Sequence, residues 1–393
     1  MLRIFCMTWN TQSVRIGEHV EQKILQQHRE GYLTGYRWNC SVPDFYPPLE
    51  KKILDNNYDI LIFSFQEDAS PGSYFHSHLL PGKLPELGYT LVRRTKMMGV
   101  GITTVKALKQ CDILTRGLRM SIYAKNDLAK AILANDLDLA KDLQGPLVRT
   151  HVHGSKFTRG KGAIAIYFRL PLKHRMVNFA VMNAHLPFDS KSLIDTVVKQ
   201  QPMIRHNAVL EQDQAYNDIY RALISDLPIK MTSVLYMGDL NYRVTPLSEQ
   251  EYAQVFSSSA GASTTVSLAK SLLMSRMHDD KAVYRRLYKE YDELLEEMNK
   301  GNIYPLLEGI DNEGPAFLPT CKLYKNRPDL VSISDAASEG GIFKTGVLHQ
   351  RTPSWCDRIL YRGVDCEEYD RYDHGTTMKQ SDHAAVIASF SLD

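Results

Sequence analysis

The sequence of 393 residues has no strong charge of either sign. Its 47 lysines and arginines nearly balance its 45 aspartates and glutamates, which leaves a formal net charge of +2. A chain with so small a net charge has no global electrostatic field that would hold a nucleic acid or an anionic membrane. Any anion-binding site in this protein must therefore be built locally.

Closely spaced cysteines and long apolar runs are missing as well. The six cysteines are scattered, without a CxxC pattern or zinc-like spacing, so we expect reduced thiols and a cytoplasmic protein. No run reaches the roughly 18 apolar residues that suggest a membrane-spanning helix. The N-terminus also lacks the basic and apolar regions of a secretion signal. The sequence therefore predicts neither export nor a membrane span.

Short apolar runs and longer amphipathic stretches are present along the whole chain. Runs rich in β-branched and aromatic residues predict strands at 2–8, 58–65, 88–93, 100–106, 163–169, 176–182, 232–237, 358–361 and 384–390. Helical spacing predicts helices at 14–29, 47–56, 126–143, 203–226 and 268–299. This mixed order favours an α/β architecture in which sheets form the core and helices cover them.

Polar side chains stand at the ends of five of these strands. They are Asn10, Glu67, Asn183 with His185, Asp239 with Asn241, and Asp382 with His383. Side chains two positions apart in a strand point the same way, so Asp239 and Asn241 can share a target, as can Asn183 and His185. Any one of these residues could simply make a turn. Together they predict a site for a hard cation such as Mg²⁺, for which phosphoryl chemistry is a natural use.

Eight motifs in a fixed order resemble one protein family. They are TWN, FQE, GKGAIAIYF, NAHL, GDLNYR, PTCK, RTPSWCDRILY and SDHAAV. They are similar to the motifs of the inositol polyphosphate 5-phosphatases, a branch of the endonuclease/exonuclease/phosphatase fold, and GDLNYR with PSWCDRIL is the most specific part. The resemblance implies a four-layer α/β sandwich of two mixed sheets packed face to face, with helices outside. It also implies one catalytic domain over residues 1–393 with an elaboration at about 12–46, although length alone would suggest two or three domains.

The resemblance implies a metal site and a water-activating group. Asn10 and Glu67 would bind Mg²⁺, with Asp382 as a further ligand or directly behind them. The ion would polarise a phosphoryl oxygen and neutralise charge on the departing alkoxide. Asp239 would orient and deprotonate the attacking water.

The family motifs also imply groups that hold the reacting phosphate. Asn241 would bind a phosphoryl oxygen, and His185 would grip the same phosphate from another side. His383, kept protonated by Asp357, would donate to the phosphoryl group as charge develops. For Arg243 two roles stay open, support of its neighbours and direct contact with phosphate.

Substrate choice would depend on cations beyond the reacting phosphate. Lys161, Lys322 and Arg351 match family positions, and the last two are associated with the 4-phosphate of an inositol ring. Three departures from the family pattern surround them: Gly160 replaces a usual Asn, Cys321 a common Tyr, and His349 a frequent Lys.

The implied activity is Mg²⁺-dependent hydrolysis of the 5-phosphate from phosphoinositide lipids, soluble inositol polyphosphates, or both. We expect a monomer, peripheral to membranes, that makes transient contact with the membrane surface and does not bind nucleic acid. One alternative is another phosphodiesterase of the same fold, a nuclease or sphingomyelinase. The other is a phosphoinositide-binding protein with weak catalysis.

Overall fold

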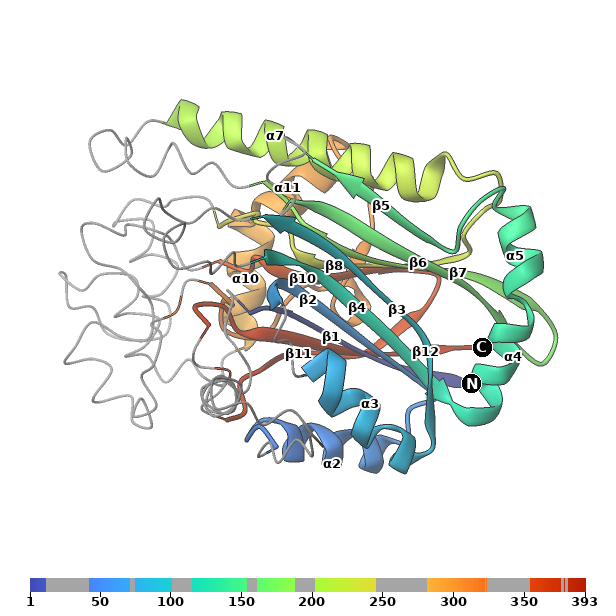
Figure 1. Cartoon of the computed structure of the whole chain (residues 1–393). Coiled ribbons are helices and arrows are strands. Elements are labelled where there is room, and N and C mark those ends of the chain that lie inside the picture. Colours follow the sequence, from blue (N-terminus) through green and yellow to red (C-terminus); the bar gives the residue numbers. More distant parts are fainter. Residues whose placement is uncertain are drawn as a thin grey trace, which may run out of the picture.

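Two six-stranded sheets packed face to face form the centre of the molecule (Figure 1). The computed structural model describes residues 1–11, 42–70, 75–100, 115–153, 161–187, 202–244, 281–321, 323, 354–375, 378 and 381–393. The first sheet has the order β11 (Asp365–Tyr372), β12 (Ala385–Leu392), β1 (Leu2–Asn10), β2 (Ile60–Ser70), β4 (Thr115–Lys125) and β3 (Tyr89–Val100). The second has the order β5 (Val148–Val152), β6 (Gly162–Pro171), β7 (Met176–His185), β8 (Ser233–Asp239), β10 (Asp357–Arg362) and β9 (Leu307–Glu308).

Each sheet contains one parallel pair among antiparallel neighbours. β1 runs parallel to β2, with Asn10 level with Gln66, and β7 runs parallel to β8, with His185 level with Asp239. The carboxyl ends of parallel strands meet at the same edge of a sheet, where open α/β sheets place their ligands. A hydrogen bond from Asn10 to Asp239 joins these two edges across the sandwich.

Both faces of each sheet are buried. In β1, Ile4 and Cys6 point into the core between the sheets, whereas Phe5, Met7 and Trp9 point outward into a second core under the helices. A strand buried on both faces has a nearly continuous apolar sequence. This is why the sequence predicts β1, β7 and β8 without a clear alternation of polar and apolar residues.

Helices cover the two outer faces and complete four layers (Figure 1). The first sheet is covered by α2 (Tyr46–Asn56), a π-helical turn at Phe75–Leu79, α3 (Leu80–Lys83) and a 3₁₀ turn at Pro85–Leu87. The second sheet is covered by α5 (Asp136–Asp142), α7 (Pro202–Tyr220) with a π-helical turn at Arg221–Ser225, and α11 (Glu293–Lys300). Side chains of α4 (Asn126–Ala134) and α10 (Lys281–Tyr291) join the core between the sheets, and a 3₁₀ turn at Ile310–Asn312 follows β9. The predicted four-layer α/β sandwich is confirmed.

Four of the described strands, β4, β5, β9 and β11, were not predicted, and the helices predicted at 126–143 and 268–299 are each divided. β4 and β5 carry Arg and Gly or His among their apolar residues, and β11 is a charged strand at a sheet edge, where charge blunts edge pairing. The helix predicted at 126–143 breaks at Asn135, whose side chain donates to the carbonyl of Ala131. The predicted helix end at Gly301 is present, with Gly301 in the left-handed region.

Some predicted segments cannot be compared with the structure. The helix at 14–29 and residues 268–280 of the helix predicted at 268–299 lie outside the described residues, as does most of the strand at 100–106. Residues 12–41 of the expected elaboration also lie there. Among the described helices, none is long and apolar enough to cross a membrane.

Candidate active site

The candidate active site lies where strand ends of the two sheets meet. Asn10 comes from the end of β1 and Glu67 from a bulge within β2. His185 and Asp239 come from the ends of β7 and β8. In the neighbouring strand β10, Asp357 is level with Asp239. His383 lies two residues before the start of β12. The fold thus brings together residues that are hundreds of positions apart in the sequence.

Asp239 is held by donors on both of its carboxylate oxygens. The Asn10 amide Nδ2 donates to Oδ2 at 2.8 Å, and the backbone N–H of Asn241 donates to Oδ1 at 3.1 Å. His185 Nε2 lies 3.4 Å from Oδ2. The side chain is only 2% exposed. These contacts fix both the orientation and the ionised state of the carboxylate.

Gly238 lets β8 reach this position. Its φ is +136°, and a Cβ there would lie 1.9 Å from the carbonyl oxygen of Ala184. No side chain other than hydrogen fits that approach. The Gly-Asp sequence at the strand end therefore packs β8 closely against β7, which places Asp239 beside His185.

His383 and Asp357 form a buried pair on the other side of Asp239. His383 Nδ1 lies 2.8 Å from Asp357 Oδ2, and the Thr320 hydroxyl donates to the same oxygen at 2.8 Å. The Ser381 hydroxyl accepts from the backbone N–H of His383 and donates to the carbonyl of Asn10. Serine and threonine hydroxyls thus hold the imidazole in place and tie it to β1. Neither residue was predicted from the sequence, although Thr320 lies in the PTCK motif and Ser381 in the SDHAAV motif.

Two residues of the site adopt a left-handed backbone conformation. Glu67 has a φ of 50° and Asn241 a φ of 60°. Such conformations cost free energy in residues other than glycine and cluster at functional sites. Glu67 lies in a β-bulge, because the register of β2 with β4 shifts between Phe65 and Asp68. The bulge re-aims Glu67, whose Oε1 lies 3.8 Å from His185 Nε2.

The side chain of Asn241 is engaged within the protein. Its Nδ2 donates to the carbonyl of Leu186 at 3.0 Å, and its Oδ1 accepts from Arg243 Nη2 at 3.0 Å. Gln212 of α7 donates to the backbone carbonyl of Asn241 at 2.8 Å. Arg243 also donates to the sulfur of Cys321 at 3.3 Å. These contacts of Arg243 are consistent with support of its neighbours, and direct contact with phosphate stays a prediction.

Lys161 brings a cation to His185. Its Nζ is within hydrogen-bonding distance of His185 Nε2. Burial lowers the pKa of Lys161, while Asp239 and Glu67 oppose that shift. A partly desolvated lysine that feels the charges of two carboxylates is a cation that could bind an anion at this site.

The pKa values of the two aspartates are driven apart. Burial raises the pKa of Asp239, but the hydrogen bond to His185 and the charges of His383 and Lys161 outweigh it, so the pKa lies well below its usual range. Burial raises the pKa of Asp357 to about 6, against the lowering effect of His383. For His383, burial lowers the pKa, and Cys321 and Asp357 more than reverse that shift and hold it well above its usual range. At neutral pH the site therefore presents one firmly ionised carboxylate and one protonated imidazole.

Four other residues that the sequence predicted for the site relate to this cluster in different ways. Asp382 is buried, and its Oδ1 lies 3.8 Å from His383 Nε2. Lys322 and Arg351 lie outside the described residues. Asn183 does not share a target with His185, which corrects the expectation from their spacing. It instead points between the sheets, where it accepts from Gln66 and donates to the carbonyls of Phe65 and Arg119.

The oxygen-rich donors of this cluster fit a hard divalent cation. Asp239, Asp357 and His383 each have one atom of a type that can ligate a metal, and these atoms lie within 4.8 Å of one another, but a protonated His383 has no lone pair for a cation. Oδ1 of Asp357 is a buried acceptor without a hydrogen-bond partner among the described residues. The ligand set expected from the sequence is different: Asn10, Glu67 and Asp382. Asn10 turns its amide nitrogen to Asp239, the orientation in which its oxygen can ligate a metal.

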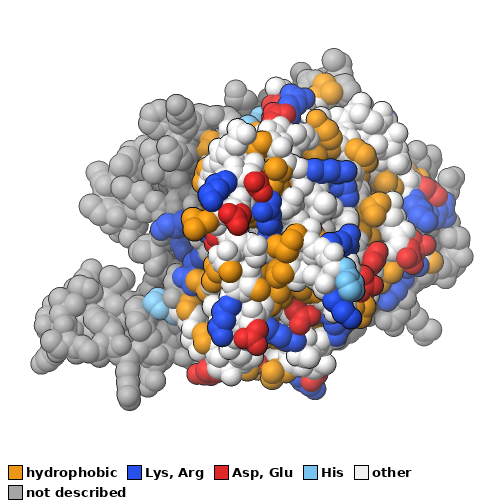
Figure 2. All heavy atoms as spheres, turned by 90° about the vertical axis from the view of Figure 1, so that its right-hand side faces the viewer, with side chains coloured by type: hydrophobic (Ala, Val, Ile, Leu, Met, Phe, Trp, Pro, Cys, Tyr) orange, Lys and Arg blue, Asp and Glu red, His pale blue; other side chains and the backbone are white. Residues whose placement is uncertain are grey.

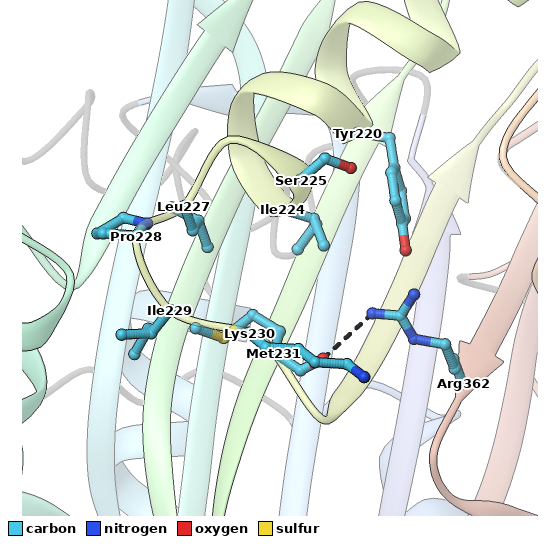
Figure 3. Close-up of a pocket in the computed structure, with 9 residues that line it drawn as sticks. All are labelled: Tyr220, Ile224, Ser225, Leu227, Pro228, Ile229, Lys230, Met231 and Arg362. Carbon is cyan, nitrogen blue, oxygen red and sulfur yellow. Dashed lines mark hydrogen bonds between the residues drawn. The ribbon is translucent and has the colours of Figure 1, made fainter.

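A hollow of about 350 Å³ lies at the opposite end of β8 from Asp239 (Figure 3). Tyr220, Ile224 and Met231 line it, and Arg362 points across it to donate to the carbonyl of Met231. None of the predicted site residues contributes to this hollow. It lies toward the end of the molecule that Figure 2 faces, where acidic, basic and apolar side chains are intermixed.

The chain belongs to the endonuclease/exonuclease/phosphatase family 2, whose model matches residues 7–389. It is 25% identical over 368 residues to a probable inositol polyphosphate 5-phosphatase of Schizosaccharomyces pombe, covering 86% of this chain and 25% of the relative. It is 30% identical over 160 residues to type I inositol polyphosphate 5-phosphatase 4 of Arabidopsis thaliana, covering 41% of this chain and 22% of the relative. The chain thus spans a quarter or less of the length of these two relatives. The family resemblance expected from the motifs is confirmed.

Solved structures show the same fold. The inositol polyphosphate 5-phosphatase domain of SpSynaptojanin, in complex with inositol (1,4)-bisphosphate and a calcium ion, matches with a TM-score of 0.54 at 18% identity. This match covers 100% of the present chain and 84% of that domain. A Cimex nitrophorin, in its ferrous NO complex, matches with a TM-score of 0.50 at 16% identity and covers 99% and 97% of the two chains. Because one fold serves both proteins, function must be argued from the site.

Proposed function

We propose that this chain is a Mg²⁺-dependent phosphatase that removes the 5-phosphate of phosphoinositides, soluble inositol polyphosphates, or both. The observation that carries the proposal is one buried cluster in which Asp239 lies opposite Asp357 and the latter pairs with His383. Within it the pKa of Asp239 is lowered and that of His383 is raised. Hydrolysis of a phosphate monoester needs an acceptor for the proton of water and a donor for the phosphoryl oxygens. The named activity of the curated relatives supports the substrate class.

In this proposal Asp239 orients the attacking water. Its two carboxylate oxygens are fixed by Asn10 and Asn241, so its remaining acceptor directions are defined. A carboxylate with a pKa this low is a weak base toward free water, and proton transfer becomes favourable only as the new P–O bond makes the water acidic. Orientation is therefore the larger part of its contribution.

The phosphate would be held from several sides. His383 donates through Nε2, because its Nδ1 is engaged with Asp357. Lys161 Nζ and His185 Nε2 lie beside Asp239, and a bound phosphate would accept from both groups in place of their contact with each other. Arg243 holds the Asn241 side chain, which binds a phosphoryl oxygen with its remaining amide hydrogen. These donors replace water around an anion whose charge grows during the reaction.

Asn10, Glu67 and Asp382 would hold the metal ion. A bound Mg²⁺ supplies Lewis-acid polarisation of a phosphoryl oxygen and neutralises the leaving alkoxide. The left-handed backbone of Glu67 supports this assignment, since strain of this kind is kept where a side chain must be aimed. We also propose that the protein is a cytoplasmic monomer that contacts membrane surfaces only transiently.

One assay tests the function and its alternatives together. The purified chain would be offered phosphoinositide vesicles, soluble inositol polyphosphates, DNA and sphingomyelin, each with Mg²⁺ or with a chelator, and Asp239→Asn would serve as the blank. We expect inorganic phosphate from 5-phosphorylated inositides only when Mg²⁺ is present. Cleavage of DNA or sphingomyelin would favour another phosphodiesterase, and binding without product would favour a binding protein.

A further inference from the structure

A network of buried polar groups surrounds the bulge that carries Glu67. The last regular pair of β2 and β4 before the bulge is Phe65 with Arg119, and the first pair after it is Asp68 with Gly117. Glu67 lies between these two pairs with its left-handed φ. A bulge leaves residues unpaired in the ladder. Something other than the ladder must therefore hold the position of Glu67.

The N-terminal side of the bulge is held from the second sheet. Asn183 of β7 donates to the carbonyls of both Phe65 and Arg119, at 3.0 and 2.8 Å. Gln66 is buried and donates to Asn183 Oδ1 and to the Thr8 hydroxyl, both at 2.9 Å. The residue directly before Glu67 is thus bonded to β1 and to β7.

The C-terminal side is held by an ion pair. Arg119 Nε lies 2.6 Å from Asp68 Oδ2, and the two side chains are only 9% and 2% exposed. A buried ion pair costs desolvation free energy, so its contribution to stability is small or even unfavourable. Its better-supported use is to specify one conformation. Here one residue, Arg119, lies beside the chain on both sides of the bulge. It pairs with Phe65 in the strand ladder before Glu67, and its guanidinium contacts Asp68 after Glu67.

We propose that the Asp68–Arg119 ion pair is a positioning device that holds Glu67 for cation binding. Its link to metal affinity depends on the proposed function, in which Glu67 is a ligand. The neighbours of metal ligands tune affinity, and their loss typically costs about 10- to 100-fold. Loss of the ion pair frees the chain after Glu67, so the carboxylate samples orientations that do not meet the ion.

The variant Asp68→Asn tests this proposal, because it removes the charge and keeps the shape. The matched control is Asp59→Asn, at the opposite end of the same two strands, where Asp59 lies 2.9 Å from Lys125. Binding of Mn²⁺ to the metal-free full chain would be followed by the electron paramagnetic resonance signal of the free ion. We expect about 10-fold weaker Mn²⁺ binding for Asp68→Asn and parental affinity for Asp59→Asn. Equal affinity in the parent and Asp68→Asn, or equal losses in both variants, would overturn the proposal.

A second measurement separates this inference from the proposed function. Amide hydrogen exchange of the metal-free chain should become faster at residues 66–68 in Asp68→Asn and remain unchanged there in Asp59→Asn. Unchanged exchange would overturn the positioning role whatever the metal results. If the parent chain binds no Mn²⁺ while exchange responds as expected, the proposed metal site fails and the structural role of the ion pair stands.

Discussion

Asp239 and Asp357 lie directly opposite each other on the paired strands β8 and β10, both buried. Two buried carboxylates at such a position repel each other unless their protonation differs or a cation lies between them. Here Asn10 and His185 stabilise the charge of Asp239, whereas Asp357 faces protonated His383 and has a pKa raised to about 6. Neighbouring acids whose environments push their pKa values apart are typical of sites in which one group acts as an acid and another as a base.

Replacement of Asp239 by Asn should remove turnover and keep the fold. Asn10 can donate to the amide oxygen as it does to the carboxylate. The NH₂ group, which replaces the oxygen that accepts from the Asn241 N–H, can neither orient the attacking water by accepting from it nor take its proton. We expect a loss of about 10²- to 10⁴-fold in kcat, measured as Mg²⁺-dependent phosphate release, with a thermal midpoint close to that of the parent. Asp127→Asn on α4, fully exposed, is the control. A variant that keeps its turnover would show that Asp239 does not handle the water.

Gly238 should tolerate no side chain. In Gly238→Ala the Cβ would meet the carbonyl oxygen of Ala184 at 1.9 Å in a backbone with φ +136°. We expect a loss of at least about 2–4 kcal/mol of unfolding free energy, measured by urea denaturation. Gly301→Ala is a matched control, since Gly301 also has a positive φ, of +73°, but nothing lies within 4 Å of its Cβ position. It should cost about 1 kcal/mol, and equal losses would mean that strain alone, not the contact with β7, governs Gly238.

The buried side chain of Asp213 should make the stability of the protein depend on pH. Burial raises the pKa of Asp213 to about 7, with the hydrogen bond to Tyr242 opposing and that to Glu297 assisting. The folded chain therefore keeps a proton that the unfolded chain loses at about pH 3.9. Stability contributed by this proton falls as pH rises between about 4 and 7.

The variant Asp213→Asn tests this pH dependence. The thermal midpoint of the parent should drop, relative to that of the variant, as pH rises through this window. The Tyr242 hydroxyl can still donate to the amide oxygen of the variant, as it does to Asp213 Oδ1 at 2.7 Å. Parallel profiles for the two proteins would show that Asp213 is ionised throughout.

Arg351 should discriminate between substrates. It lies outside the described residues, and its assignment to the 4-phosphate comes from the family motif. Arg351→Ala should reduce kcat/KM by about 10-fold or more on 4,5-bisphosphorylated inositides, and less on substrates that lack the 4-phosphate. The exposed residue Arg175 provides a control variant of the same type, Arg175→Ala. Equal losses on both kinds of substrate would show that Arg351 does not recognise the 4-phosphate.

The sequence by itself determined the class of fold and named the residues of the candidate site. Apolar runs predicted β1, β7 and β8, because strands buried on both faces are apolar throughout. The polar residues after those runs, read with the family motifs, pointed to Asn10, Glu67, His185, Asp239 and His383. Strands with interrupted apolar patterns, such as β4 and β11, escaped prediction because edge pairing and inter-sheet contacts decide their burial.

Tertiary structure alone decided how those residues are held. Local spacing suggested that Asn183 shares the target of His185. In the structure Asn183 instead forms hydrogen bonds with Gln66 and with the carbonyl of Arg119, and these bonds connect the two sheets. The hydrogen bond from Asn10 to Asp239 joins residues 229 positions apart. Propensity and periodicity describe neighbours within a few residues, whereas such bonds depend on how two sheets pack. The sequence therefore shows which side chains are available for the site, and the packing of the two sheets sets their orientation and their charge.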